Sequence, residues 1–288
     1  MIFVKLYGGL GNQLFQYALG RNLSEINNTR LKLDVSDLVN ITPVGTGTKR
    51  DYRLKFFNIT GDIATPEELR YFKDRPKNLR YFYSKLKPYY KRPVIVEKTF
   101  SFDDNILKVK DGSYLYGYWQ SEKYFLYVQD ILRHELTLKD GLSDNAKQIG
   151  DTILNSISVS LHIRRGDYLI KYYNDYHLLG INYYSKAISY IKNACKNVKV
   201  FVFSDDLDWA RKNLENMTDI IFVCSNEDFE DLYLMSLCQH NIIANSSFSW
   251  WGAWLNKNEK KTVLYSRDWF RGNKNSIRDL IIEGWIPI

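Results

Sequence analysis

The chain has 288 residues, of which 45% are hydrophobic and 25% are charged, values typical of a globular protein. It contains no run of about 18 apolar residues, which excludes a membrane-spanning helix, and its first nine residues become polar too early for a signal peptide. We therefore expect a cytoplasmic protein. Its three cysteines, Cys195, Cys224 and Cys238, lack metal-ligand spacing and are expected to be reduced thiols in the core.

The net charge of +7 suits an acidic ligand, an anionic membrane surface or nucleic acid. Much of the excess lies between Lys73 and Arg92, where Lys, Arg and Tyr alternate. We expect a solvated surface segment there. Peripheral contact with the inner face of a membrane, or a cover over a sugar acceptor, stays open as an alternative. A nucleic-acid partner is not expected, because basic patches are common on soluble proteins.

The first half of the chain predicts a strand, a glycine turn and an amphipathic helix in that order. The region 36–112 is less regular and is punctuated by proline and glycine. The predicted elements are strands over 2–6, 31–34 and 114–118, and helices over 12–26 and 122–133.

From about residue 144 strands and helices alternate, which is typical of a parallel sheet with crossover helices on both faces. The sequence therefore predicts an α/β protein in two halves, 1–143 and 144–288. The predicted elements of the second half are strands over 157–163, 198–203, 220–224, 241–244 and 262–265, and helices over 182–194, 207–214, 229–239 and 248–255.

Five polar clusters follow predicted strands at their carboxyl ends. In open α/β sheets this edge binds ligands, so we expect the clusters to share one rim that forms a site. They are residues 8–12, 162–167, 204–206, 225–228 and 245–249.

The adjacent Arg164 and Arg165 are the most specific feature of this rim. A guanidinium group is always charged, and its planar fork of donors fits phosphate oxygens. A solvated arginine pair on a loop is the alternative, but the buried strand before the pair and the Gly-Asp-Tyr after it favour an anion site. His162, just before the arginines, is expected to be a packed residue that orients them or the substrate, with catalysis less favoured.

The glycine turn at 8–11 leads into a helix N-terminus, where free N–H groups and the helix dipole favour an anion. Asn12 is the predicted N-cap. A purely structural turn is an equal alternative.

A second helix start carries three hydroxyls, those of Ser246, Ser247 and Ser249, which can donate to phosphate oxygens. The alternative is a serine N-cap, and both can hold together. Three tryptophans that follow have the spacing of a buried face and are expected in the core: Trp250, Trp251 and Trp254.

The segment Asp205-Asp206-Leu207-Asp208 contains an Asp-x-Asp pair, a spacing that can hold a divalent cation. N-capping of the next helix explains one carboxylate without a metal, and a carboxylate here could also accept hydrogen bonds from a base such as guanine. Because no second set of ligands is visible elsewhere, we expect no metal.

Taken together, four segments resemble the bacterial α-1,2-fucosyltransferases of glycosyltransferase family 11, over most of the chain to about residue 255. The region 36–112 matches nothing of this kind. The four segments are Gly8-Gly-Leu-Gly-Asn-Gln-Leu-Phe-Gln-Tyr-Ala18, His162-Ile-Arg-Arg-Gly-Asp-Tyr168, Phe203-Ser-Asp-Asp206 and Asn245-Ser-Ser-Phe-Ser-Trp-Trp-Gly-Ala-Trp254.

The resemblance implies a GT-B-like fold of two Rossmann-type lobes, an acceptor-side lobe over 1–143 and a GDP-fucose-binding lobe over 144–288, with a cleft between them. It implies inverting, metal-independent transfer of L-fucose from GDP-β-L-fucose to the 2-hydroxyl of a galactose-containing glycan, in glycan or O-antigen synthesis. No cofactor is implied besides the donor substrate. A fucosyltransferase of another linkage, or a non-catalytic basic protein that binds nucleic acid or membrane, is the alternative.

The resemblance also implies roles for individual residues. Arg164 and Arg165 would hold the diphosphate, with Arg165 favoured for the β-phosphate, and Asp167 would be the general base or a clamp on an arginine. The remaining implied contacts are Asp205 or Asp206 with guanine or ribose, Ser246, Ser247 and Ser249 with the pyrophosphate, Gly11 and Asn12 at the cleft, and His162 beside the donor.

Overall fold

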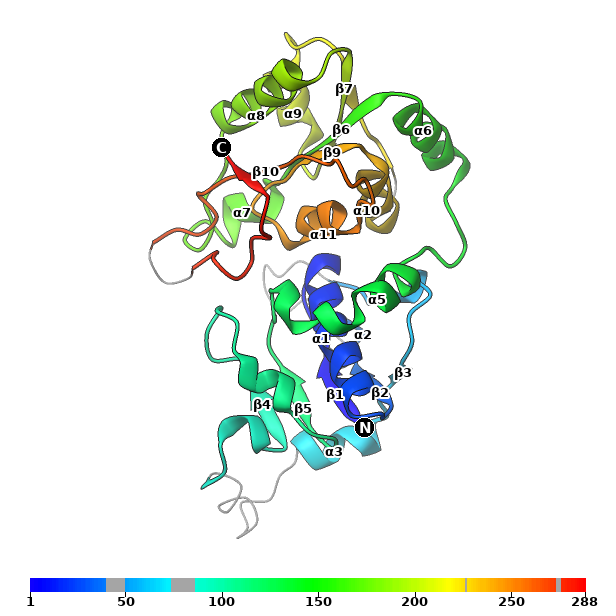
Figure 1. Cartoon of the computed structure of the whole chain (residues 1–288), viewed down its shortest axis with the longest axis vertical. Coiled ribbons are helices and arrows are strands. Elements are labelled where there is room, and N and C mark those ends of the chain that lie inside the picture. Colours follow the sequence, from blue (N-terminus) through cyan, green and yellow to red (C-terminus); the bar gives the residue numbers. More distant parts are fainter. Residues whose placement is uncertain (40–49, 74–85, 226, 273–275) are drawn as a thin grey trace. The chain divides into compact units, whose positions relative to one another are not determined.

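The computed structural model describes residues 1–39, 50–73, 86–225, 227–272 and 276–288 (Figure 1). Most of the basic segment expected between Lys73 and Arg92, part of the region 36–112, and Asn226 of the fourth polar cluster lie outside the described residues. The chain forms two compact units, which are Met1–Lys139 with Ser276–Ile281 (unit 1) and Asp140–Asn275 with Ile282–Ile288 (unit 2). The sequence placed the boundary four residues later, after residue 143, and did not foresee that the last residues divide between the units.

Unit 1 is built on a five-stranded parallel sheet with the order β3-β2-β1-β5-β4. From the central β1 the chain adds β2 and β3 on one side, and later β4 and β5 on the other. The strand order therefore reverses between β1 and β5, which makes this pair a topological switch point. The strands are β1 (Ile2–Lys5), β2 (Leu31–Asp34), β3 (Asp62–Ile63), β4 (Val94–Val96) and β5 (Tyr114–Tyr116); β3 and β4 were not predicted.

The main helix of unit 1, α1 (Leu10–Ile26), begins two residues earlier than expected. Gly9 is its N-cap residue, so the prediction that Asn12 caps the helix is wrong. The cause is Gly8, whose φ of +79° turns the chain so that the helix follows at once. Among the described residues, the other helices of unit 1 that lie before β5 or end the unit's first part are α2 (Ser36–Val39), α3 (Pro66–Lys73) and α5 (Gln129–Glu135), with 3₁₀-helices η1 (Leu54–Phe56), η2 (Tyr89–Lys91) and η3 (Asp104–Lys108).

The helix predicted over 122–133 is wrong in its first half. Two 3₁₀-helices, η4 (Glu122–Tyr124) and η5 (Leu126–Val128), precede α5. Phe125 interrupts the helical backbone with a φ of −143°. Its ring is fully buried and packs against Phe15 at 6.2 Å between ring centroids, so tertiary packing overrides the helical pattern here.

Unit 2 contains a six-stranded parallel sheet with the order β11-β10-β9-β6-β7-β8. The chain runs outward from β6 through β7 and β8, then returns to β9 on the other side of β6, so the switch point lies between β6 and β9. All five predicted strands are present, with ends within two residues of the prediction. The strands are β6 (Ile157–Ile163), β7 (Val198–Ser204), β8 (Ile220–Phe222), β9 (His240–Ile242), β10 (Val263–Tyr265) and β11 (Ile286–Pro287).

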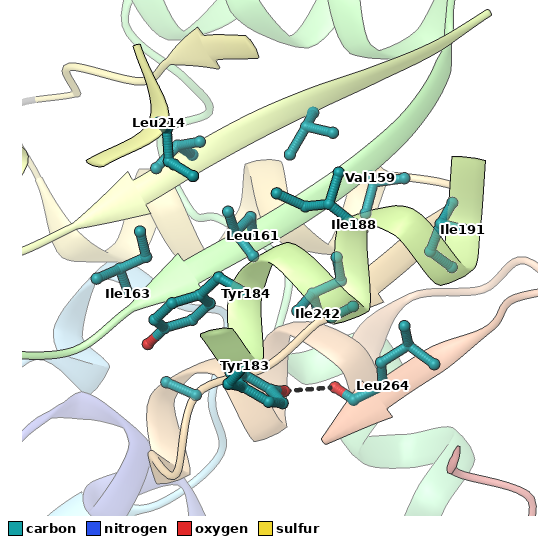
Figure 2. Close-up of a cluster of buried hydrophobic side chains, with 14 of the residues drawn as sticks. Val159, Leu161, Ile163, Tyr183, Tyr184, Ile188, Ile191, Leu214, Ile242 and Leu264 are labelled. Carbon is teal, nitrogen blue, oxygen red and sulfur yellow. Dashed lines mark hydrogen bonds between the residues drawn. The ribbon is translucent and has the colours of Figure 1, made fainter. Parts of the chain in front are cut away.

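Helices cover both faces of this sheet. Alternate residues of β7 show it, because Val200 and Val202 join one buried cluster with α8, whereas Phe201 and Phe203 join another with α6 and α10. Figure 2 shows the first cluster, in which the Tyr183 hydroxyl donates to the carbonyl of Leu264 at 3.3 Å. The helices are α6 (Asp144–Leu154), α7 (Gly166–Ile170), α8 (Ile181–Ala194), α9 (Leu207–Leu214), α10 (Asp228–Leu237) and α11 (Ser247–Leu255); α6 and α7 were not predicted.

The cysteine prediction is right for one residue and wrong in part for the others. All three thiols are free, and Cys238 is buried in the core. Cys195 is only partly buried, and Cys224 is exposed because β8 ends two residues before it. Within the ranges described, no helix combines the length and the apolar character needed to cross a bilayer.

Candidate functional site

Arg164 and Arg165 follow directly on β6, at the switch point of the unit 2 sheet. The neighbouring strand β7 contributes Asp205 and Asp206 at the same edge, because all strands of the sheet are parallel. The crevice at such a switch point is where α/β sheets commonly bind ligands. Four of the five predicted clusters, those after β6, β7, β8 and β9, therefore follow strands of one sheet at one edge, whereas the cluster at 8–12 follows β1 of the unit 1 sheet.

Arg164 is held between two carboxylates. Its Nη2 donates to Oδ1 of Asp167 at 2.7 Å, and its Nη1 lies 3.0 Å from Oδ2 of Asp205. The guanidinium carbon also lies 5.6 Å from the ring centroid of Tyr168. Burial alone would lower the pKa of Arg164, but Asp205 and Asp167 outweigh it and raise the pKa above its usual value. Arg164 is thus held in a fixed position, and its positive charge is neutralised by the two carboxylates.

Arg165 is clamped differently. Its Nε donates to Oδ2 of Asp206 at 3.1 Å, and its guanidinium carbon lies 4.1 Å from the ring centroid of Trp209, within cation–π range. The side chain is only 12% exposed. Among the residues that the structure covers, neither terminal nitrogen has a hydrogen-bond partner. One edge of a rigid, oriented fork is therefore available to two oxygens of an anion.

Two carboxylates of the segment 205–208, those of Asp205 and Asp206, are engaged with these arginines. Asp205 accepts from the backbone N–H of Arg165 at 2.8 Å through Oδ1, and Asp206 caps α9 by accepting from the N–H of Trp209 at 3.1 Å. The capping interpretation is thus confirmed for Asp206. A contact with guanine or ribose would use the lone pairs that remain on these oxygens. No group of three His, Cys, Asp or Glu side chains that could hold a metal ion occurs in the described ranges.

Asp167 holds Arg164 in place. This contact corresponds to the clamp role, one of the two roles implied for Asp167 by the resemblance; the other was that of general base. Its carboxylate accepts from Arg164, and its side chain is only 10% exposed. The neighbouring Tyr168 donates its hydroxyl to the carbonyl of Asn245 at 2.9 Å, so α7 is tied to the segment after β9. This contact joins the two sides of the switch point.

The three serines after β9 have different environments. Ser246 caps α11 by accepting from the N–H of Phe248 at 3.3 Å. Ser249 is buried, and its hydroxyl donates to the carbonyls of Ala244 and Ser246. In this structure its hydroxyl therefore donates within the protein and not, as expected, toward a phosphate. Ser247 is the partly exposed one of the three. The tryptophan prediction is confirmed, since Trp250, Trp251 and Trp254 are all buried.

His162 is a packed residue. Its side chain is buried with the ring centroid 5.4 Å from that of Phe248, and Nδ1 has no hydrogen-bond partner among the described residues. Burial, with a smaller contribution from Arg164, lowers the pKa of His162 to about 3. No hydrogen bond joins it to either arginine in the described part of the chain, so an orienting contact with the arginines is not seen there.

Gly11 and Asn12, which the resemblance placed at the cleft, with Asn12 among the catalytic candidates, lie in unit 1, in the first turn of α1. Asn12 Oδ1 accepts from Nε2 of Gln120 at 2.8 Å. This bond ties α1 to the segment after β5 and so bridges the switch point of unit 1. Gly8 gives Asn12 its space, because a β-carbon on Gly8 would lie 2.7 Å from Asn12 Nδ2.

Trp209 and the structural role of Asn245 were not predicted from the sequence. Trp209 stands three residues after the capping Asp206, and this spacing could have placed its ring beside the same end of the helix. Asn245 donates to the carbonyls of His177 and Trp269 at 2.7 and 2.9 Å. Those partners are distant in sequence, so no local pattern identifies them.

The whole chain, residues 1–288, matches the family model described as Glycosyl transferase family 11. It is 33% identical over 299 residues to an Escherichia coli protein named alpha-1,2-colitosyltransferase, with 100% of this chain and 99% of that protein covered. It is 35% identical over 303 residues to the Escherichia coli O-antigen biosynthesis glycosyltransferase WbnK, with 98% and 99% covered. A Bos taurus galactoside alpha-(1,2)-fucosyltransferase 1 is 24% identical over 263 residues, with 86% of this chain and 64% of that protein covered.

Two solved structures share the fold. NodZ alpha-1,6-fucosyltransferase soaked with GDP-fucose has a TM-score of 0.52 at 14% identity, with 88% of this chain and 91% of that chain covered. A mutant of Arabidopsis thaliana FUT1 in complex with GDP has a TM-score of 0.54 at 12% identity, with 92% and 70% covered. The predicted α/β class, GT-B-like with two Rossmann-type lobes and a parallel sheet in the C-terminal half, is confirmed, and unit 1 contains a parallel sheet as well. The full-length family match and the two relatives above 30% identity show that the chain belongs to glycosyl transferase family 11.

Proposed function

We propose that this glycosyltransferase transfers L-fucose from GDP-β-L-fucose to the 2-hydroxyl of a galactoside, with inversion at the anomeric carbon and without a metal ion. The observation that carries the proposal is Arg165. Its largely buried guanidinium is oriented by Asp206 and Trp209, and its two terminal nitrogens have no partner among the described residues and so can bind a ligand.

The chemistry requires a group of this kind. The bond between the anomeric carbon and the β-phosphate oxygen breaks, its electron pair stays on GDP, and the acceptor oxygen forms the new bond while its proton leaves to a base. A preorganised donor aimed at the growing negative charge stabilises such a transition state, typically by about 3–4 kcal/mol. Arg165 supplies that donor, whereas the charge of Arg164 is offset by Asp167 and Asp205.

Asp167, Asp205 and Asp206 are assigned as positioning residues. Each carboxylate holds one of the arginines through a side-chain or backbone contact. Ser247 and the remaining lone pairs of Asp205 and Asp206 are the candidates for further contacts with the pyrophosphate and the nucleoside. His162 is a buried residue packed on Phe248, and unit 1 with Gly11 and Asn12 is the acceptor-side unit of the proposal.

A second donor is favoured by one observation. The relative at 33% identity over its full length is named an alpha-1,2-colitosyltransferase. Colitose is fucose without the 3-hydroxyl, so the same diphosphate site would serve both donors. A donor pocket that discriminates between the two sugars needs a polar group that forms a hydrogen bond with the 3-hydroxyl of fucose.

The test is a ligand and product panel. Thermal unfolding would be measured with GDP, GDP-fucose, GDP-colitose, GDP-mannose and UDP-sugars, because a ligand that binds the native state raises its apparent stability. We expect GDP and one GDP-6-deoxyhexose to stabilise the protein, and the disaccharide product to carry an α-1,2 linkage by NMR. Stabilisation by UDP-sugars alone, or another linkage in the product, would contradict the proposal.

A further inference from the structure

Three tyrosines gather at the switch point of unit 1. Tyr7 follows β1, Tyr116 ends β5 and Tyr118 lies just beyond it. The ring centroid of Tyr7 lies 5.2 Å from that of Tyr116 and 4.8 Å from that of Tyr118. Tyr116 and Tyr118 are 42% and 39% exposed. Unit 1 therefore presents contiguous aromatic surface at the edge of its sheet where α/β proteins bind ligands.

A carboxylate accompanies these rings. Glu97, directly after β4, accepts from the backbone N–H of Tyr118 at 2.6 Å and from that of Trp119 at 3.0 Å. Burial, followed by the hydroxyls of Tyr118 and Tyr116 and by Glu97, raises the pKa of Tyr7, so its hydroxyl keeps its proton as a donor. Aromatic faces, hydroxyl groups and an acceptor carboxylate are thus combined at one place.

The turn that carries Tyr118 is strained. Trp119 has a φ of +57°, which is a rare conformation for a bulky side chain and costs on the order of 1–3 kcal/mol. Glu97 holds the turn through its two backbone contacts, and Gly117 is required because a β-carbon there would lie 2.4 Å from Cβ of Glu97. A strained turn that the surrounding contacts over-determine is typical of a ligand-binding position.

We propose that Tyr7, Tyr116, Tyr118 and Glu97 form a subsite for the pyranose ring of the acceptor glycan. The inference rests on the proposed function, because it takes the acceptor to be a galactoside. The apolar C–H face of a galactose ring stacks on an aromatic face, while its hydroxyls donate to a carboxylate and accept from phenol groups. An anionic ligand is disfavoured, because the carboxylate of Glu97 would repel it.

The test uses methyl β-D-galactopyranoside and the full-length protein. Saturation-transfer NMR would detect contact between tyrosine ring protons and the C–H groups of the sugar directly, without any transfer reaction. We expect a signal with the wild-type protein and its loss in Tyr116→Ala and Tyr118→Ala. In steady-state kinetics the same variants should raise the acceptor KM by about tenfold and leave the donor KM unchanged, since each removes one aromatic contact.

Tyr127→Ala is the matched control, because Tyr127 is a 75% exposed tyrosine of the same unit outside the cluster. Unchanged thermal unfolding and GDP affinity would show that the variants fold. Absence of a wild-type sugar signal, or an equal signal in all variants, would overturn the inference. A protein that binds the galactoside through these tyrosines but does not accept GDP-fucose would overturn the proposed function instead.

Discussion

Gly166 leaves space that the carboxylate of Asp205 fills. A β-carbon on Gly166 would lie 2.6 Å from Oδ2 of Asp205, the oxygen that lies 3.0 Å from Arg164. Glycine at this position is therefore a requirement of the ion-pair network, which couples the loop after β6 to the end of β7.

Gly166→Ala should push Asp205 away from Arg164 and misplace both arginines. Because displacements of about 1 Å can cost about 100-fold in rate, we expect transfer activity to fall by one to two orders of magnitude. Steady-state kinetics with saturating donor would measure the loss. Gly180→Ala is the control, since nothing lies within 4 Å of the β-carbon it would add. Equal activity of the two variants would show that the network tolerates the shift.

The two arginines should respond differently to truncation. Arg165→Ala removes the free fork, so we expect the rate to fall by about 100- to 1,000-fold, with little change in thermal unfolding. Arg164→Ala removes the guanidinium that pairs with Asp167 and Asp205, and should lower the free energy of unfolding by about 1–3 kcal/mol as well.

Calorimetric titration of GDP and denaturant unfolding would separate the two effects. Arg165→Lys is the companion variant, because an ammonium group keeps the charge but cannot bind two oxygens as a fork. Full GDP affinity in Arg165→Ala would contradict the role assigned to this residue.

Chelation should leave the reaction unchanged. Guanidinium groups perform the charge neutralisation in this proposal, so we expect equal initial rates with and without excess EDTA. Added Mg²⁺ or Mn²⁺ should not raise the rate of the chelated enzyme. A rate that collapses with EDTA and returns with one of these ions would show that a cation shares the diphosphate with Arg165.

Asp231 should make the fold sensitive to pH. Burial, and to a lesser extent the neighbouring Asp228 and Glu230, raise the pKa of this carboxyl to about 7, although its hydrogen bond with Ser225 acts in the other direction. In the unfolded chain the pKa is about 4. Between these values the unfolded state has lost the proton that the folded state keeps, so stability falls as the pH rises from about 4 to about 7.

Asp231→Asn mimics the protonated carboxyl and still offers an oxygen to Ser225. We therefore expect the variant to be more stable than the wild type at pH 8, with a difference that shrinks toward pH 4. Thermal unfolding of both proteins over this pH range is the measurement. A difference that does not change with pH would mean that Asp231 ionises normally in the folded protein.

Local pattern was sufficient for much of unit 2. The apolar run of β6 and the alternation of strands and helices predicted the five strands closely, because buried parallel strands and amphipathic helices leave strong periodic signals. The short strands β3 and β4 and the five-residue helix α7 were missed, because segments this short do not show a recognisable hydrophobic periodicity. The helix expected over 122–133 was misjudged because the burial of Phe125 depends on residues distant in sequence.

The sequence by itself determined the kinds of group at the site and the edge of the sheet where they would meet. Residue types and strand order are local properties, and parallel strands bring their carboxyl ends together. Only the tertiary structure decided which arginine is neutralised and which keeps a free edge, because that depends on carboxylates 40 and 41 residues away. The same holds for Tyr7 and Tyr118, which follow different strands and acquire a shared surface only when β1 and β5 pair.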